Sequence, residues 1–418
     1  MGFLIRFLDP LGRTDDKAPE AYRFTPESRS WAVPLGLGAA LLVVTLVLAT
    51  AGDGEHLFSQ RFYFSYLTAW VFCLTISLGG LFFVLVQHLT RAHWSVAVRR
   101  IPELLMMNFP ILAVLGIPVV LGMHDLYHWT HEELYVVGGA EYDPILAGKR
   151  GYLNTAFFIG RLVFYFAMWI YISSRLYRLS IEQDVDPNPR RNAQERQVSA
   201  WGLLVFALTA AFAGIDLVMT LDPHWFSTMF GVYFFSGSFF VALASVTLVA
   251  LFLQRGGYLK NVITVEHYHD LGKFMFAFTV FWTYIAFSQY MLIWYGNLPE
   301  ETVWFRHRME GSWAIASWAL LLGHFLIPFF LLMLRSAKRT RGMLYIMGFW
   351  FLMVHFLDLF WLAMPAQSHH FSVEMIDITA WLGMVFLFVG LIVLRAARHA
   401  TVPYNDPNFK ASLAFENA

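Results

Sequence analysis

The dominant pattern in this sequence is a series of long apolar runs separated by short polar segments. A helix needs about 20 mostly apolar residues to cross the hydrocarbon core of a bilayer, and ten runs reach that length. They occupy residues 31–51, 61–89, 102–123, 152–175, 198–221, 228–254, 271–296, 312–335, 342–364 and 373–396. The pattern therefore predicts an all-α, polytopic membrane protein with ten transmembrane helices.

Basic residues are distributed unevenly between the segments that join these helices. Of the 29 Lys and Arg residues, 22 fall in the N-terminal segment, in the loops after even-numbered helices or in the C-terminal tail, and five fall in the other loops. Loops rich in Lys and Arg stay in the cytoplasm. Both termini, residues 1–30 and 399–418, are therefore predicted to be cytoplasmic, and the loops after helices 3 and 7 are predicted to face outward.

Composition narrows the class of protein further. The chain is 58% apolar and carries a formal net charge of zero, so no overall charge favours a nucleic-acid partner. The single cysteine, Cys73, excludes an intramolecular disulfide, a Cys-ligated iron–sulfur cluster and a CxxCH haem attachment. Redox centres, if the function needs them, must come from other chains.

Small residues and prolines predict how some helices pack and bend. Residues 77–80 (SLGG) and 236–238 (SGS) predict close approach of two helix backbones. Pro110, Pro118 and Pro328 are predicted to kink their helices. The segment 267–270 (HYHD) is predicted to lie in a cytoplasmic loop, and no metal site is predicted there or elsewhere.

A few strongly polar residues interrupt the apolar spans, mostly in the half nearest the outer face. They are Arg161, Asp216, Gln289, His324, His355 and Asp358. A charge in hydrocarbon costs at least ~2.5–3.5 kcal/mol, so these side chains should face the interior of the helix bundle. Two interpretations stay open: either Arg161 bridges the carboxylates and locks the helices together, or the titratable groups carry protons.

The two halves of the chain resemble each other at several positions. In both, Asp-Leu precedes a helix-ending proline at the same spacing, in residues 216–223 and 358–365. Two further pairs follow in the same order: Gly160-Arg161 with Gly323-His324, and Tyr63-Phe64 with Tyr233-Phe234. These matches predict two four-helix bundles, residues 61–221 (helices 2–5) and 228–364 (helices 6–9), with helices 1 and 10 outside them. Residues 31–398 would then form one membrane domain.

Two long and unusual stretches carry a resemblance to a known family. Residues 221–237 read LDPHWFSTMFGVYFFSG, and residues 284–302 read YIAFSQYMLIWYGNLPEET. Together they resemble the NrfD/PsrC-like membrane subunits of alternative complex III, a quinol:cytochrome c (or other electron-carrier) oxidoreductase. The ten-span plan extends the resemblance over essentially the whole chain, and the short segment before the first span is closer to the shorter of the two such subunits.

The resemblance implies a multi-pass subunit of the bacterial inner membrane that holds no redox centre and no covalently bound cofactor of its own. Its expected partners are the larger NrfD-like subunit, an iron–sulfur subunit, c-type haem subunits and a terminal oxidase, all in a lipid bilayer without nucleic acid. Haem and iron–sulfur centres would lie in those partners. The expected small-molecule ligand is menaquinol or another quinol, and the expected contribution is proton translocation linked to quinol oxidation.

Candidate site residues follow from the intramembrane polar groups and from the family stretches. The candidate proton pathway comprises Arg161, Asp216, Asp222, His224, Gln289, Glu300, His324, His355 and Asp358. The candidate quinol-binding residues are Asp222, His224, Tyr233, Gln289 and Tyr290. No catalytic residue and no metal ligand is predicted.

Two other functions stay open at this point. Internal repeats and buried ionisable groups also suit a proton-coupled secondary transporter, which would purify alone rather than with partners. His324 and His355 could instead be the axial ligands of a b-type haem, which an absorption spectrum would reveal.

Overall fold

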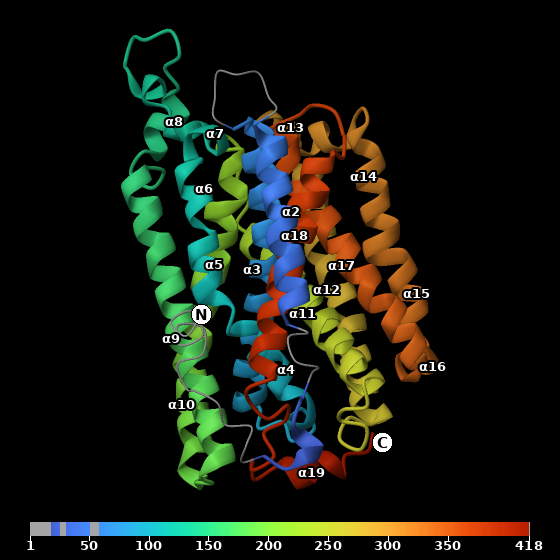
Figure 1. The fold of residues 1–418 in the computed structure, drawn as a ribbon. Coiled ribbons are helices and arrows are strands. Elements are labelled where there is room, and N and C mark those ends of the chain that lie inside the picture. Colours follow the sequence, from blue (N-terminus) through green and yellow to red (C-terminus); the bar gives the residue numbers. More distant parts are fainter. Residues whose placement is uncertain (1–17, 26–30, 51–57, 418) are drawn as a thin grey trace.

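The computed structural model describes residues 18–25, 31–50 and 58–417 (Figure 1). Within these residues, ten helices are long and apolar enough to cross a membrane, as the sequence predicts. They are Ala32–Ala49 (α2), Gln60–Leu89 (α3), Val96–Leu121 (α4 to α6), Thr155–Val185 (α9), Pro189–Leu221 (α10 and a 3₁₀ turn), Phe230–Arg255 (α11), Val265–Gly296 (α12), Trp313–Met333 (α14, a π-helical segment and α15), Arg341–Ala366 (α17 and a 3₁₀ turn) and Met375–Ala396 (α18).

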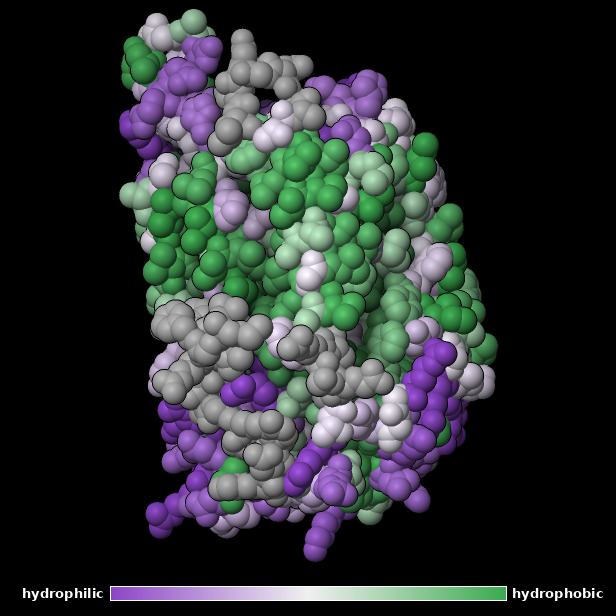
Figure 2. Space-filling model, in the orientation of Figure 1, coloured by the Kyte–Doolittle hydropathy of each residue, from purple (hydrophilic) through white to green (hydrophobic). Residues whose placement is uncertain are grey.

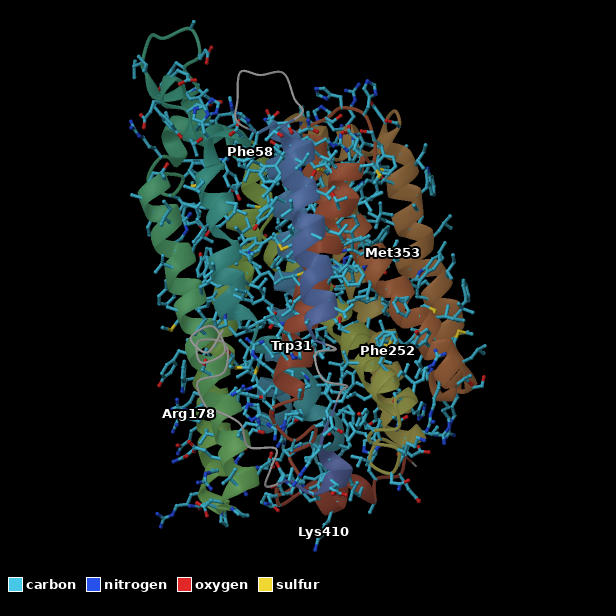
Figure 3. The ribbon with its side chains drawn as sticks, in the orientation of Figure 1. Trp31, Phe58, Arg178, Phe252, Met353 and Lys410 are labelled. Carbon is cyan, nitrogen blue, oxygen red and sulfur yellow. The ribbon has the colours of Figure 1, made fainter. Side chains whose placement is uncertain are left out.

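Short helices lie at the two ends of the molecule. Pro144–Lys149 (α8) and Pro299–Met309 (α13) lie at one end, and Phe409–Leu413 (α19) lies at the other, where Lys410 is labelled (Figures 1 and 3). Green, apolar surface fills the middle of the face shown in Figure 2, and purple, hydrophilic surface gathers at both ends. This distribution is the one expected of helices that cross a bilayer.

Helices α3 and α11 form the centre of the molecule and pack closely against each other. A Cβ added to Gly79 of α3 would lie 2.2 Å from the carbonyl oxygen of Ser238 in α11. The predicted close approach of residues 77–80 and 236–238 is therefore confirmed. The terminal spans α2 and α18 pack against each other in the same way, since a Cβ on Gly38 would lie 2.6 Å from the backbone nitrogen of Leu387.

Two of the spans are interrupted where prolines were predicted to bend them. The third span divides into Val96–Met106 (α4), Phe109–Leu115 (α5) and Ile117–Leu121 (α6), with Pro110 and Pro118 each at the second residue of its segment. The eighth span contains a π-helical segment, Leu321–Leu326, followed by Ile327–Met333 (α15) with Pro328 at its second position. Proline cannot donate the backbone hydrogen bond that a continuous helix requires.

The prediction of a loop at residues 267–270 was wrong. Helix α12 begins at Val265, and its first turn buries His267, Tyr268, His269 and Asp270 within the molecule. The Thr264 side chain accepts from the backbone N–H of Glu266, and the imidazole of His267 accepts from the backbone N–H of Thr264. Polar residues such as these are typical of a loop, whereas here they begin the helix, and the ring of His267 lies against that of Phe415 in the C-terminal segment.

The C-terminal segment is docked on the helices rather than extended. Asp406 is buried and pairs with Arg99, and the Ser412 hydroxyl donates to the carbonyl oxygen of Trp94 at 2.7 Å. Arg100 pairs with Glu103 and with Asp184 nearby. These buried charges tie the C-terminal segment to the α19 end of the bundle. Most of the predicted N-terminal segment, residues 1–30, lies outside the described residues.

Candidate functional site

The first buried carboxylate, Asp216, is completely enclosed by partners. Arg161 donates to both of its oxygens, from Nε and Nη2, at 2.9 Å each. The hydroxyls of Tyr152 and Tyr165 donate to the same two oxygens at 2.9 and 2.8 Å. The guanidinium also lies 3.8 Å from the ring centroid of Tyr152. This saturated ion pair joins α9 to α10 and has the geometry of a structural lock.

The second buried carboxylate, Asp358 of α17, has different surroundings. Tyr233 donates from its hydroxyl to Oδ1, and Trp282 donates from Nε1 to Oδ2 at 3.2 Å. Both donors are uncharged, and within the described part of the chain no Lys or Arg forms an ion pair with Asp358. An ionised carboxylate this deeply buried is costly without a cation or a proton. Asp358 is therefore suited to bind a proton or another cation.

Two histidines lie beside Asp358. His324, His355 and Asp358 each place one nitrogen or oxygen atom within 4.8 Å of the others, and all three side chains are buried. Both ring nitrogens of His324 and Nδ1 of His355 have no hydrogen-bond partner, whereas Nε2 of His355 lies 3.0 Å from the hydroxyl of Thr75. Orphaned buried polar atoms are rare in proteins. They leave this cluster with unused capacity for protons, water or a metal ion.

The π-helical segment and a glycine together give the histidines their places. His324 lies within the π-helical segment Leu321–Leu326, a geometry that is often found at functional positions. Its ring stacks 3.6 Å from the ring centroid of Trp282 and 4.2 Å from that of Phe240. A Cβ at Gly237 would lie 2.9 Å from Cε1 of His355, so the glycine leaves room for that ring.

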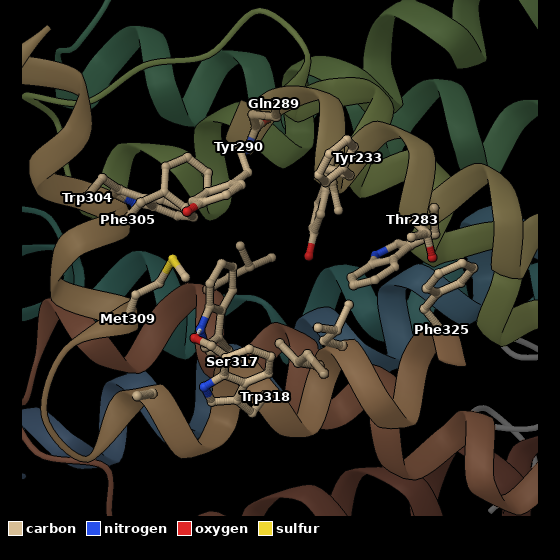
Figure 4. Close-up of a pocket in the computed structure, with 18 residues that line it drawn as sticks. Tyr233, Thr283, Gln289, Tyr290, Trp304, Phe305, Met309, Ser317, Trp318 and Phe325 are labelled. Carbon is tan, nitrogen blue, oxygen red and sulfur yellow. Dashed lines mark hydrogen bonds between the residues drawn. The ribbon is translucent and has the colours of Figure 1, made fainter. Parts of the chain in front are cut away.

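An aromatic pocket of about 430 Å³ lies next to this cluster. Its walls come from α12, α13, α14 and α17, with Tyr233 of α11 pointing into the cavity (Figure 4). Two of its lining residues, Phe287 and Trp318, are 57% and 61% exposed on the outside of the bundle. The pocket therefore opens on a surface that would face lipid. Its size and mostly apolar lining are typical of a small-molecule site.

The pocket and the acidic cluster share two residues. Tyr233 and Trp282 line the cavity and also donate the two hydrogen bonds to Asp358. A molecule in the pocket would thus be separated from the carboxylate by one phenolic hydroxyl. Gln289 accepts from the Ser227 hydroxyl at 2.9 Å and, with Tyr290 and Ser317, adds polar atoms to the cavity wall.

Arg308 supports the walls of the pocket from behind. It is buried in α13 and donates to the carbonyl oxygens of Trp361 and Leu362, at 3.1 and 2.9 Å, which ties α13 to the end of α17. Its guanidinium lies 3.6 Å from the ring centroid of Trp304, a pocket residue. Burial lowers the pKa of Arg308 to about 9, against an opposing effect of Asp222, so the side chain stays charged at neutral pH.

The structure brings together only some of the residues proposed from the sequence. Tyr233, Gln289 and Tyr290 line the pocket, whereas Asp222 and His224 do not. His224 instead pairs with Asp143, the N-cap of α8.

Asp143 and Glu300 also lie outside the aromatic pocket. Burial alone would raise the pKa of Asp143, but hydrogen bonds from His224 and from the backbone N–H groups of Ile145 and Leu146 hold it below its usual value. Glu300 is exposed in the first turn of α13, outside the pocket.

Two residues of the site were missed from the sequence. Trp282 stood out only as one aromatic residue among many in an apolar span, and Arg308 was counted only as a loop charge. Its spacing of four residues from Trp304 is the one local signal that could have found Arg308, because such residues share a helix face.

No protein-family model matches this chain, and no curated protein matches it. What the pocket binds must therefore be inferred from its own residues. Aromatic walls suit a flat apolar ring system, polar atoms on the wall suit oxygen substituents on that ring, and the open side suits a lipid tail. Asp358 behind Tyr233 adds a group that can accept a proton.

The histidine and aspartate cluster also has the donors of a metal site. Two imidazoles and one carboxylate occur as ligands of zinc and of non-haem iron. Both oxygens of Asp358 already accept hydrogen bonds, so a metal ion would have to compete with Tyr233 or Trp282 for one of them. The sequence predicted no metal site, and the three residues meet only in the fold.

Proposed function

We propose that this chain is the membrane subunit of a quinol:electron-acceptor oxidoreductase of the alternative complex III type, most like the shorter subunit, ActF. In this proposal the aromatic pocket binds the quinol head group, and the Tyr233–Asp358 pair receives its protons. The observation that carries the proposal is the shared wall: Tyr233 and Trp282 belong to the lipid-facing pocket and to the buried acid at the same time.

Quinol oxidation releases two protons and two electrons. As the Tyr233 hydroxyl accepts the proton of a quinol hydroxyl, it passes its own proton to Asp358, whose neutral hydrogen-bond donors leave it able to become protonated. His355 and His324 hold the next unused nitrogen atoms. The electrons leave to a haem or iron–sulfur centre of a partner subunit, because this chain supplies neither a cysteine cluster nor a CxxCH motif.

The internal repeat supports different roles for the carboxylates of Asp216 and Asp358. Asp216 and Asp358 occupy matching positions in the two halves, and the residue matched to Arg161 is His324. Arginine holds a permanent charge and saturates Asp216, whereas neither ring nitrogen of His324 has a hydrogen-bond partner, so Asp358 is left without a fixed cation. The first half then acts as a lock and the second half as the proton-binding site.

The remaining parts of the proposal concern the assembly and the outer proton exit. The ten helices form two four-helix bundles, in a bacterial inner membrane, with partner subunits that carry haem and iron–sulfur centres and with a terminal oxidase. Asp222, His224 and Glu300 belong to the outer end of the proton route. Their positions near α8 and α13 are compatible with that part, although none of the three lines the pocket.

The test uses three matched variants. Tyr233→Phe removes one hydroxyl from the pocket, Asp358→Asn removes the acid, and Tyr295→Phe removes a hydroxyl from a residue of the same α12 helix that is 83% exposed. Binding of a short-chain menaquinone to the purified chain in nanodiscs is measured by quenching of tryptophan fluorescence. Quinol oxidation is measured in the purified complex.

We expect Asp358→Asn and Tyr233→Phe to slow quinol oxidation by about a hundredfold or more, the usual effect of losing general acid–base catalysis. Tyr295→Phe should behave as the unmodified chain. Normal oxidation rates in both Tyr233→Phe and Asp358→Asn would contradict the proposal, and so would a chain that purifies without partners and binds no menaquinone.

A further inference from the structure

A second cavity, of about 190 Å³, lies at the opposite end of the molecule from α8 and α13. It is formed where α3 ends, where α4 begins and where the first turns of α10 meet the C-terminal segment. The residues that line it are Gln87, His88, Arg91, Ala92, His93, Arg99, Asn192, Arg196 and Asn408. Nearly all are polar, and every charged side chain among them is basic.

Two of the arginines in this cavity have their charge available. Arg99 is already paired with Asp406, and His88 lies 3.6 Å from Glu195. Arg91 and Arg196 form no ion pair with any described residue. Arg91 is exposed and Arg196 is half-buried, so both can reach a ligand from solvent.

Buried polar atoms in the same cavity lack partners. His88 and Gln87 are 6% and 4% exposed, and neither Nε2 of His88 nor Oε1 of Gln87 has a hydrogen-bond partner. A buried polar group without a partner costs about 1–3 kcal/mol. Nε2 of an imidazole can donate a hydrogen bond to an oxygen atom, whereas Oε1 of Gln87 accepts hydrogen bonds and can receive one from a protonated phosphate or from water. The cavity thus combines two available charges with buried polar atoms, one of them an imidazole nitrogen, that lack hydrogen-bond partners.

Arg91 has a backbone conformation that is unusual for an arginine. The residue has a φ of 52° and follows the C-cap of α3, where the backbone N–H of Ala92 donates to the carbonyl oxygen of Gln87 at 3.1 Å. Glycine is the usual residue at this position of a helix end, because it adopts positive φ without steric cost. Here a long cation occupies a position that the fold alone would leave to glycine.

We propose that this cavity binds a phosphate group, either the head group of an anionic phospholipid or free phosphate. The cavity lies at the end of the membrane-crossing part of α3, on the side that the charge distribution predicts to be cytoplasmic. Basic pockets between helices at that level bind phospholipid head groups in other membrane proteins. The inference does not depend on the quinol pocket, which lies toward the other end of the helices.

The experiment compares two double variants of the full chain, purified in a neutral detergent. The first combines Arg91→Gly with Arg196→Gln, and its glycine keeps the backbone turn at residue 91. The control combines Arg255→Gln with Lys260→Gln, which removes the same charge from two exposed residues outside the cavity. Native mass spectrometry counts bound cardiolipin, and equilibrium dialysis measures inorganic phosphate.

We expect the cavity variant to bind one of the two probes at least about tenfold more weakly than the control variant, a difference of about 1.4 kcal/mol. Loss of cardiolipin binding identifies a lipid head group as the ligand, and loss of phosphate binding identifies the free anion. If the cavity variant and the control variant bind both probes equally well, the proposal is wrong.

Discussion

At the scale of single residues, Asp216 and Asp358 show how surroundings decide the behaviour of one side-chain type. Both are buried aspartates near the carboxyl end of a long helix. Asp216 accepts four hydrogen bonds, two of them from a guanidinium, so its charge is fully compensated. Asp358 accepts only from a phenol and an indole, so a proton is the simplest way to compensate its charge.

Replacing Arg161 should test the lock directly. Arg161→Gln leaves Asp216 buried without a cation, and removing one partner of a buried pair typically costs about 3–5 kcal/mol. The double variant Arg161→Gln with Asp216→Asn leaves no unpaired charge and should be more stable than the single variant. Thermal unfolding of the purified chains in one detergent measures the difference.

The same two variants separate the lock from the proposed proton pathway. A cost below about 1 kcal/mol for Arg161→Gln, as for an exposed ion pair, would contradict the lock. If the double variant slows quinol oxidation as strongly as Asp358→Asn, Arg161 and Asp216 belong to the proposed proton route. Normal oxidation in a stable double variant would limit the proposed route to Asp358 and its neighbours.

At the scale of helices, glycines determine how closely the spans approach one another. Gly79 of α3 lies against the backbone of α11, whereas Gly160 of α9 is exposed and would meet nothing within 4 Å of an added Cβ. The same substitution should therefore have opposite effects at the two positions, because one adds a clash and the other only improves helix propensity.

We expect Gly79→Ala to destabilise the protein by about 1–3 kcal/mol, since the helices must move apart to admit the methyl group. Gly160→Ala should be neutral or stabilising by up to about 1 kcal/mol. Thermal unfolding of both variants under one condition measures the two effects. Equal stability of the two variants would show that α3 and α11 do not approach as closely as described.

The helices also illustrate which local features a sequence reveals. Apolar runs of about 20 residues, prolines at residues 110, 118 and 328, and the small-residue stretches predicted spans, interruptions and close contacts. The π-helical segment Leu321–Leu326 and the helical start of α12 at Val265 were not predicted. The formation of a π-helical turn depends on how its side chains pack against neighbouring helices, and no local sequence pattern specifies that packing.

At the scale of the whole molecule, the charge distribution predicts which end faces the cytoplasm. Cys73 is the only cysteine and is buried, so new cysteines can report on topology without interference. Val137 is 82% exposed near α8, and Lys410 is exposed at the α19 end. In intact cells that produce each variant, a membrane-impermeant maleimide should label Val137→Cys at once and Lys410→Cys only after the membrane is opened.

The reverse labelling pattern would invert the predicted topology. It would place α13 and the aromatic pocket nearer the cytoplasm and would move the phosphate-binding cavity to the outer face. Labelling of both cysteines in intact cells would show that the two ends do not lie on opposite sides, which would contradict the ten-span arrangement itself.

The amino-acid pattern was sufficient to predict a membrane protein, the number and places of its spans and a short set of intramembrane polar residues. Those properties depend on the hydrophobicity of one continuous segment at a time, because the bilayer selects each span by its length and apolar character. Three of the five candidate quinol-binding residues also line one pocket, namely Tyr233, Gln289 and Tyr290.

Which polar residues meet depends on how the helices pack in three dimensions. Partners in a helix bundle are set by the depth, rotation and tilt of each helix, and these depend on packing between segments far apart in the sequence. The structure thus pairs Arg161 with Asp216 rather than with Asp358, and it places Asp358 beside two histidines and an aromatic pocket. The same packing gathers Arg91 and Arg196 at the other end of the bundle, where the sequence showed only two basic residues in separate loops.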